Sequence, residues 1–233
     1  KKQTEDYVTG RFRDTFRGAT DLLPKIAGVL RTLEQDAEPL EWIPLRDPPL
    51  VDWVMTERPR QHLAVGPTLE LHLIPLGVSS RLPATRLEAA PEQLARVGRE
   101  HVLFSAGDAL DLLANESEAV ASRASGRGVD AAGLAVRSSQ GVSAWEELRR
   151  DSLGTILDRS DVASRLARLL RIGSEVLTPR ASRVGIAVGV GPTQSLSEGD
   201  VRDLGRRSSS TMDMRDRLIR VEAEESVPAS ALR

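Results

Sequence analysis

The residue types that carry out most enzyme chemistry are scarce or scattered in this sequence. There is no cysteine, which excludes disulfides, zinc-thiolate sites and cysteine nucleophiles. Lysine occurs only at positions 1, 2 and 25, so a Schiff-base or phosphate-loop lysine has no candidate beyond Lys25. His62, His72 and His101 cannot be tied to any serine from sequence, and no Gly-x-Ser-x-Gly motif is present. We therefore predict no catalytic residue.

Carboxylates and glycines offer two weaker patterns. Close groups of acidic residues could bind a divalent ion, but solvated strand and loop faces explain them better; they are Glu146-Glu147, Asp200 with Asp203, and Glu222 with Glu224 and Glu225. Gly189-Val-Gly191 lacks the later glycine of a dinucleotide fingerprint, because Gln194 stands there, and indicates plain strand glycines. We expect no metal site and no cofactor.

Arginine supplies the one basic and flexible segment. Arg206-Arg207-Ser-Ser-Ser-Thr211 could hold phosphate through bidentate guanidinium groups, and Arg165 and Arg168 on a predicted helix could extend that surface. The segment lacks the aromatic residues on which bases stack, and an exposed loop is the simpler interpretation. Weak nucleic-acid binding is the most that this pattern predicts.

An apolar stripe marks the beginning of the chain, and residues 1–36 are predicted to form one kinked helix or two helices around Pro24. The stripe packs either on the chain's own domain or on a partner, including a second copy. Its candidate interface residues are Phe12, Phe16, Leu23, Ile26, Leu30 and Leu33.

Prolines interrupt residues 37–62, which we interpret as an extended connector held in place by Trp42 and Trp53. Residues 63–233 are predicted to form one α+β domain. It begins with a half-buried strand at Thr68–Leu76, in which His72 lies on the polar side. We expect helices within 89–124, although 101–105 reads equally well as a short strand, and a helix end followed by a mobile loop at 115–130.

The rest of the domain shows clearer periodicity. A strand at Gly133–Arg137, a turn at Ser138–Gly141 and two or three antiparallel strands within 144–157 are predicted. A helix capped by Asp161 and ending near Gly173 follows. The last elements are a central strand at Val184–Gly191, a loop over 195–214 and a strand at Arg217–Ala223. The fold class is therefore α+β, with a mixed or antiparallel sheet and flanking helices, preceded by the N-terminal helical segment.

Composition limits the setting of the protein. The chain has 233 residues, of which 40% are hydrophobic, which suffices for a core. No apolar run approaches the roughly 20 residues of a membrane span and no signal peptide opens the chain, so we expect a cytoplasmic protein without membrane contact. The use of arginine in place of lysine, with abundant Ala, Gly and Val, is typical of a GC-rich bacterial genome.

The order of elements in about the last 100 of the 233 residues resembles a bacterial family. The similar features are Trp145 before Arg150-Asp151-Ser152, Leu169-Leu-Arg-Ile-Gly173, the Val-rich strand at 184–190, and Asp216-Arg-Leu218 with Glu222. This order is similar to the region that follows the Schlafen AlbA-type domain in bacterial DNA-binding or ATP-binding proteins. The AlbA-type domain itself normally lies N-terminal to that region and is not recognisable in this sequence.

Two functions are compatible with these features. The favoured one is a non-catalytic regulatory or assembly domain of an AlbA/Schlafen-like nucleic-acid-binding protein, associating with itself or with a protein partner. The alternative is part of a nucleic-acid-processing or nucleotide-binding enzyme of the defence type, whose catalytic domain lies elsewhere. The missing lysines and the lack of a catalytic motif favour the first.

Overall fold

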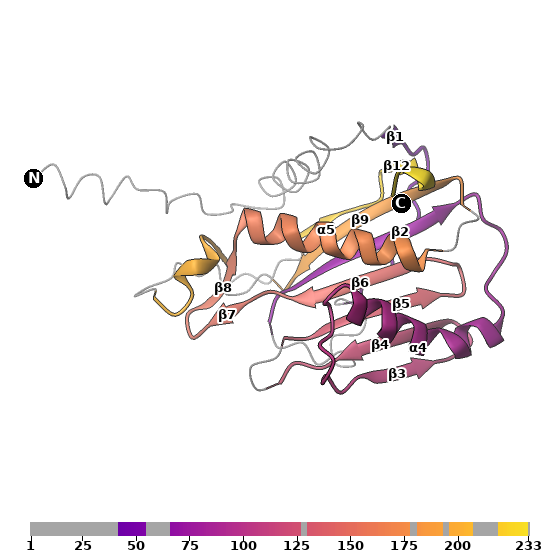
Figure 1. The fold of residues 1–233 in the computed structure, drawn as a ribbon. Coiled ribbons are helices and arrows are strands. Elements are labelled where there is room, and N and C mark those ends of the chain that lie inside the picture. The colour runs from indigo at the N-terminus through magenta and orange to yellow at the C-terminus, as the bar shows by residue number, and fades with distance from the viewer. Residues whose placement is uncertain are drawn as a thin grey trace, which may run out of the picture.

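The fold is built on one large antiparallel sheet, seen here in a computed structural model (Figure 1). The structure describes residues 42–54, 66–126, 130–177, 181–192, 196–206 and 219–232. The predicted helical segment 1–36, with its six interface residues, lies outside them. The α+β class with an antiparallel sheet and flanking helices is confirmed.

In the described part of the chain, nine strands form the large sheet, in the order β1-β12-β9-β2-β6-β5-β4-β3, with β11 also paired to β9. Their bounds are β1 Ile43–Pro44, β2 Thr68–Leu76, β3 Asp111–Ala114, β4 Glu118–Arg123, β5 Ala132–Arg137, β6 Val142–Glu147, β9 Arg183–Gly191, β11 Ile219–Val221 and β12 Glu225–Pro228. The long pair β2 and β9 lies near the middle, where Leu69 pairs with Val190 and Leu73 with Ile186. Apolar residues at these positions explain why both strands are buried.

Two helices, α4 (Ala84–Glu100) and α5 (Arg159–Val176), cover one face of this sheet (Figure 1). We call this side the helix face. The side chains of Leu69, Leu71 and Leu73 point to it, because alternate residues of a strand share a face, and all three belong to the main core. The helices contribute the other half of that core through Leu87, Leu94, Leu166, Leu169 and Ile172.

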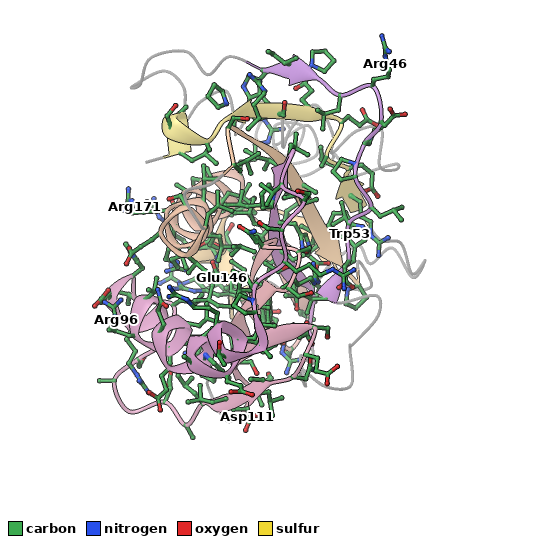
Figure 2. All side chains as sticks on the ribbon, turned by 90° about the vertical axis from the view of Figure 1, so that its right-hand side faces the viewer. Arg46, Trp53, Arg96, Asp111, Glu146 and Arg171 are labelled. Carbon is green, nitrogen blue, oxygen red and sulfur yellow. The ribbon has the colours of Figure 1, made fainter. Side chains whose placement is uncertain are left out.

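Residues 42–54, which we call the cover segment, run from the edge strand β1 onto the opposite face, which we call the cover face, where Val51, Trp53 and Val54 pack against the sheet. Figure 2 shows Trp53 on the side of the sheet away from the helices. Trp53 lies against Gly189, where an added Cβ would stand 2.6 Å from the indole ring, and Trp145 lies against Gly133 in the same way. Glycines at these two strand positions make room for the two indoles. The described part of the predicted connector therefore contributes a strand, β1, and a covering side chain to the sheet.

A separate small sheet follows the order β10-β8-β7 and joins β7 (Arg150–Asp151), β8 (Gly154–Leu157) and β10 (Leu196–Glu198). Short 3-10 helices occur at η1 (Val201–Asp203) and η2 (Ala229–Leu232). The β7-β8 hairpin confirms the turn predicted around Asp151 and Gly154. Most predicted strand positions are confirmed, including Thr68–Leu76 with the bounds expected from sequence.

Several local predictions are wrong. Residues 115–130 were expected to be a helix end and a loop, but β4 lies within them, because its small residues Ala119 and Ala121 allow α4 to pack closely over the sheet. Residues 101–105 form a turn rather than a strand or helix. Helix α5 begins after Asp158 rather than Asp161 and continues three residues past Gly173 to Val176. The predicted loop 195–214 contains β10 and η1.

Candidate functional site

Three residues that can form a catalytic relay meet on the cover face. His72 of β2 pairs directly with Ser143 of β6, and Glu70 precedes His72 by two residues on the same face. The Nδ1 atom of His72 lies 2.9 Å from Ser143 Oγ, and its Nε2 atom lies 3.2 Å from Glu70 Oε2. The order serine, imidazole, carboxylate is that of the hydrolase triads. Sequence could not link this histidine to a serine, because the link depends on the register of two strands 71 residues apart.

The relay is closed to solvent. Only 1% of Ser143, 1% of His72 and 2% of Glu70 is exposed, although His72 was predicted to lie on a polar strand face. The indole of Trp53 meets the imidazole edge to face at 4.8 Å between ring centroids, and the amide of Val54 donates to Glu70 Oε2 at 2.9 Å. A substrate therefore has no path to the hydroxyl in this arrangement, and the contacts bind the cover segment to the sheet.

Two arginines on strands of the sheet also contact the cover segment. The guanidinium of Arg220 lies 4.6 Å from the ring centroid of Trp53, a cation-π contact. Arg137 of β5 donates to the carbonyl oxygen of Asp52 at 2.6 Å and forms an ion pair with its carboxylate at 2.7 Å. These contacts explain why a segment with little secondary structure has a fixed position.

The adjacent carboxylates Glu146 and Glu147 do not form a metal site. Neighbouring residues of a strand point to opposite faces, so Glu146 points to the helix face and Glu147 to the cover face. Both are buried, whereas solvated faces were predicted. Glu147 accepts a hydrogen bond from the amide of Ala131, and burial, followed by the charge of Glu147, raises the pKa of nearby Asp130. Among the described residues no group of three or more His, Asp or Glu side chains is arranged to hold a metal ion.

Glu146 instead joins β6 to α5 through two arginines that were predicted to contact phosphate. Arg165 Nη1 lies 2.9 Å from Glu146 Oε2, and its Nε lies 2.6 Å from Asp161 Oδ2. Arg168 donates to the same Glu146 oxygen. Arg165 is buried between two carboxylates, so its guanidinium cannot reach the backbone of a nucleic acid.

Arg206 has a different environment. It is exposed in the turn after η1, where its amide donates to the carbonyl oxygen of Asp203. Arg207 lies outside the described residues. The structure thus places Arg206 at the surface and Arg165 in the core, and it does not join them into one phosphate-binding surface.

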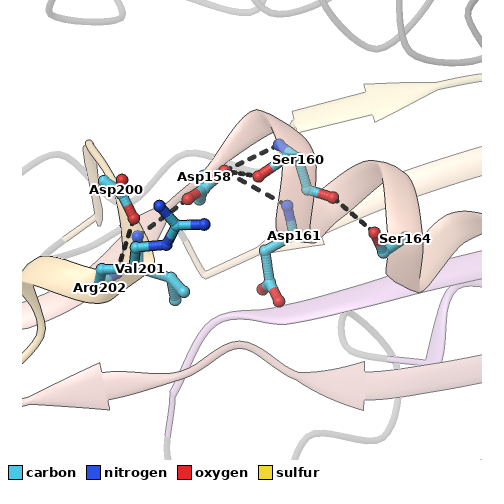
Figure 3. A pocket seen from close by; sticks show the side chains of 7 residues that line it. All are labelled: Asp158, Ser160, Asp161, Ser164, Asp200, Val201 and Arg202. Carbon is cyan, nitrogen blue, oxygen red and sulfur yellow. Dashed lines mark hydrogen bonds between the residues drawn. The ribbon is translucent and has the colours of Figure 1, made fainter.

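A polar pocket of about 450 Å³ lies at the N-terminus of α5 (Figure 3). Asp158 is its central residue: one carboxylate oxygen accepts from the amides of Ser160 and Asp161, and the other accepts from the amide of Val201. Burial acts to raise the pKa of Asp158, but the hydrogen bonds from Ser160, Val201 and Asp161 outweigh it and lower that pKa. Asp158 therefore caps α5 and attaches η1 to it. The other lining residues are Ser164, Asp200 and Arg202.

The last candidate is an edge of the sheet. Strand β3 pairs with β4 on one side and has no strand neighbour on the other among the described residues. All four of its residues are exposed, including 44% of Leu112 and 60% of Leu113. Figure 2 shows Asp111 at one extreme of the molecule and Arg46 at the other. The sequence pattern does not identify these leucines, because Asp-Leu-Leu-Ala has no two-residue alternation of apolar and polar residues.

Comparisons with known proteins add no relative. No family model, curated protein or solved structure matches the chain. No helix in the described part of the chain has the length and apolar character needed to cross a membrane. Two features of the described residues bear on function, the closed relay and the open edge of the sheet.

Proposed function

We propose that this chain is a non-catalytic assembly domain of a bacterial, cytoplasmic AlbA/Schlafen-like nucleic-acid-binding protein, and that it associates through strand β3. The observation that carries the proposal is the contrast between polar groups that bond within the fold and an apolar sheet edge that no described strand covers. Glu70, His72 and Ser143 hold the cover segment, and Glu146 with Arg165 holds α5. Leu112 and Leu113 make no comparable contribution to the core.

An exposed apolar edge strand needs an explanation. Backbone groups at a sheet edge can pair with any other strand, so proteins usually protect such edges with proline, lysine, a bulge or a covering segment. Strand β3 contains no proline, lysine or bulge, and no strand of the described residues pairs with its open side; its two exposed leucines raise the tendency to associate. Strand addition at such an edge is a common mode of protein recognition.

The experiment that tests assembly is sedimentation velocity of the full chain over a wide concentration range, alone and with the double substitution Leu112→Lys and Leu113→Lys. Two lysines at the edge introduce repulsion and should leave the chain monomeric with an unchanged circular dichroism spectrum. Leu50→Lys is the matched control, because Leu50 is 99% exposed in the cover segment. It should associate like the wild type. A wild-type chain that stays monomeric throughout would contradict assembly through self-association.

A hydrolase is the second candidate, favoured only by the hydrogen bond between Ser143 and His72. We expect no labelling of Ser143 by a fluorophosphonate serine probe, because the hydroxyl is buried under the cover segment. Labelling that is lost in Ser143→Ala but retained in Ser139→Ala would show that the cover segment opens and that the relay is catalytic.

The contribution of the chain to nucleic-acid binding is proposed to be weak and to come from Arg206 and Arg207. Any binding of DNA by phosphate contacts should fall steeply with salt. The double substitution Arg206→Ala and Arg207→Ala should reduce that salt dependence, whereas Arg165→Ala should unfold part of the core instead. No mobility shift of DNA by the wild type at low salt would remove this part of the proposal.

A further inference from the structure

Strand β3 has a backbone direction that specifies how a second strand can pair with it. Asn115, which extends β3, donates its amide to the carbonyl oxygen of Glu118 at 2.9 Å. In an antiparallel pair hydrogen-bonded positions alternate, so Asn115, Leu113 and Asp111 bond to β4. Leu112 and Ala114 therefore direct their N–H and C=O groups away from β4, toward the open edge.

We propose that this edge binds β3 of a second copy of the chain, in antiparallel register about a two-fold axis at Leu113. This inference rests on the proposed assembly function and adds the partner and the pairing. In this register Leu113 lies opposite the second copy's Leu113, and Leu112 lies opposite Ala114. Four backbone hydrogen bonds then form between the outward groups of Leu112 and Ala114 of the two strands.

The symmetry supports this register. A two-fold axis that relates adjacent antiparallel strands is perpendicular to the sheet, so each residue must face one on the same side. Leu112 pairs with Ala121, whose side chain points to the helix face, and Leu113 pairs with Val120 on the cover face. Leucine therefore meets leucine on the cover face and alanine on the helix face.

Side-chain chemistry at the ends of the strand also fits. Asp111 lies opposite the second copy's Asn115 in this register. The Oδ1 atom of Asn115 accepts from the amides of Ser117 and Glu118 and from the hydroxyl of Ser117. The amide NH₂ of Asn115 is thus the end available to donate to the Asp111 carboxylate. Like charges are not directly opposed at any of these positions.

Other registers fit less well. An axis at Leu112 would place the Asp111 carboxylate opposite Leu113, an apolar side chain that offers it no donor. A slip by one residue would bring side chains of opposite faces together and is excluded by the symmetry. The pairing about Leu113 also continues the sheet with both copies of α4 on one side, because α4 packs on β3 and β4.

Cysteine crosslinking tests the register, since the chain has no cysteine of its own. Residues opposite each other at a non-hydrogen-bonded position have Cα atoms about 4.5 Å apart, within the range of a disulfide. We expect Leu113→Cys to form a disulfide-linked dimer under mild oxidation at micromolar concentration. Leu112→Cys should not, because the two Leu112 positions are diagonal neighbours about 7–8 Å apart. Leu50→Cys measures the rate of random collision at an exposed leucine.

The outcomes separate the inference from the function on which it rests. Crosslinking at least tenfold faster for Leu113→Cys than for both other variants supports the pairing. Faster crosslinking of Leu112→Cys overturns it. Equal rates in all three variants also overturn the pairing. Sedimentation of the wild type then tests the assembly function: an associating chain would assemble through another surface, whereas a monomeric chain would contradict both the pairing and the assembly function. A monomer whose β3 amides exchange slowly with deuterium would show that another segment of the same chain covers the edge, which likewise overturns the inference.

Discussion

The two faces of the large sheet are both buried, but by different types of residue. On the helix face, Leu69, Leu71 and Leu73 of β2 contact apolar side chains of α4 and α5. On the cover face, the alternate residues Thr68, Glu70 and His72 of the same strand are buried just as completely. There the cover segment, and no helix of the described residues, packs on the sheet. Two indoles fill the space beneath it, Trp53 of the segment and Trp145 of β6.

The comparison teaches that polar residues in a strand do not identify a solvent face. Burial of polar groups is tolerated when each finds a hydrogen-bond partner. Glu70 has two, the amide of Val54 and the ring of His72, and His72 also meets Ser143. The helix face gains its stability from apolar area, whereas the cover face depends on paired polar groups beneath an aromatic side chain.

The largest effect should come from removing that side chain. Trp53→Ala should lower the free energy of unfolding by about 3–5 kcal/mol, the cost typical of a buried aromatic residue. Urea unfolding followed by circular dichroism measures it. Leu50→Ala in the same segment is the control and should change stability by less than about 0.5 kcal/mol, because Leu50 is exposed. A Trp53→Ala variant as stable as this control would show that the cover face is not a core.

The fit of the second indole can be tested at Gly133. A Cβ added there would overlap the six-membered ring of Trp145, and the indole is buried and cannot move aside freely. Gly133→Ala should cost up to about 3 kcal/mol, as for other overpacked cores. The matched control is Gly141→Ala, whose Cβ would have only ordinary contacts, the nearest at 3.6 Å. Equal midpoints for the two variants would contradict the proposed fit.

The strands and helices differ in how far sequence could predict them. Periodicity located β2, β9 and α5, because each has a continuous stripe of large apolar residues, and it located β5 from Leu134 and Val136 followed by a turn. It missed β4, whose Glu-Ala-Val-Ala-Ser-Arg sequence has weak strand character; this strand depends on its pairing with β3 and β5 and on the packing of α4 over its alanines. Tertiary pairing determined that element.

The candidate site was less predictable for a related reason. The contact between His72 and Ser143 follows from strand register, and the pairing of Glu146 with Arg165 follows from the position of α5 on the sheet. Neither leaves a local pattern. The arginines were recognised as charged helix positions, but only the packed structure shows that Arg165 faces a carboxylate rather than solvent.

A smaller effect is expected from the buried histidine. His72→Ala removes the imidazole partner of Ser143 Oγ and leaves Glu70 Oε2 with only the amide of Val54, which should cost about 2 kcal/mol. His101→Ala is the matched control, because His101 also contacts a glutamate, Glu175 at 2.7 Å, but at the surface. It should cost less than about 1 kcal/mol. Chemical denaturation at neutral pH distinguishes the two, and equal losses would mean that burial does not strengthen the relay.

The smallest effect lies at the end of the helix face, where Asp158 caps α5. Asp158→Ala should lower the free energy of unfolding by about 1 kcal/mol at pH 7, as for other N-caps, because the amides of Ser160 and Asp161 lose their acceptor.

The pKa of Asp158 is lowered in the folded state, so the unfolded chain takes up the proton first as the pH falls. The contribution of its charge is therefore complete above about pH 4, the ordinary range of aspartate, and is lost as the pH falls through the lower folded pKa. Unfolding free energies at pH 7 and pH 3 should show the difference between wild type and Asp158→Ala shrinking in acid. Asp158→Asn keeps one capping oxygen but loses the charge and the second acceptor, so it should be less stable than the wild type at pH 7 and closer to it at pH 3. A difference between wild type and Asp158→Ala that grows in acid would contradict the capping role.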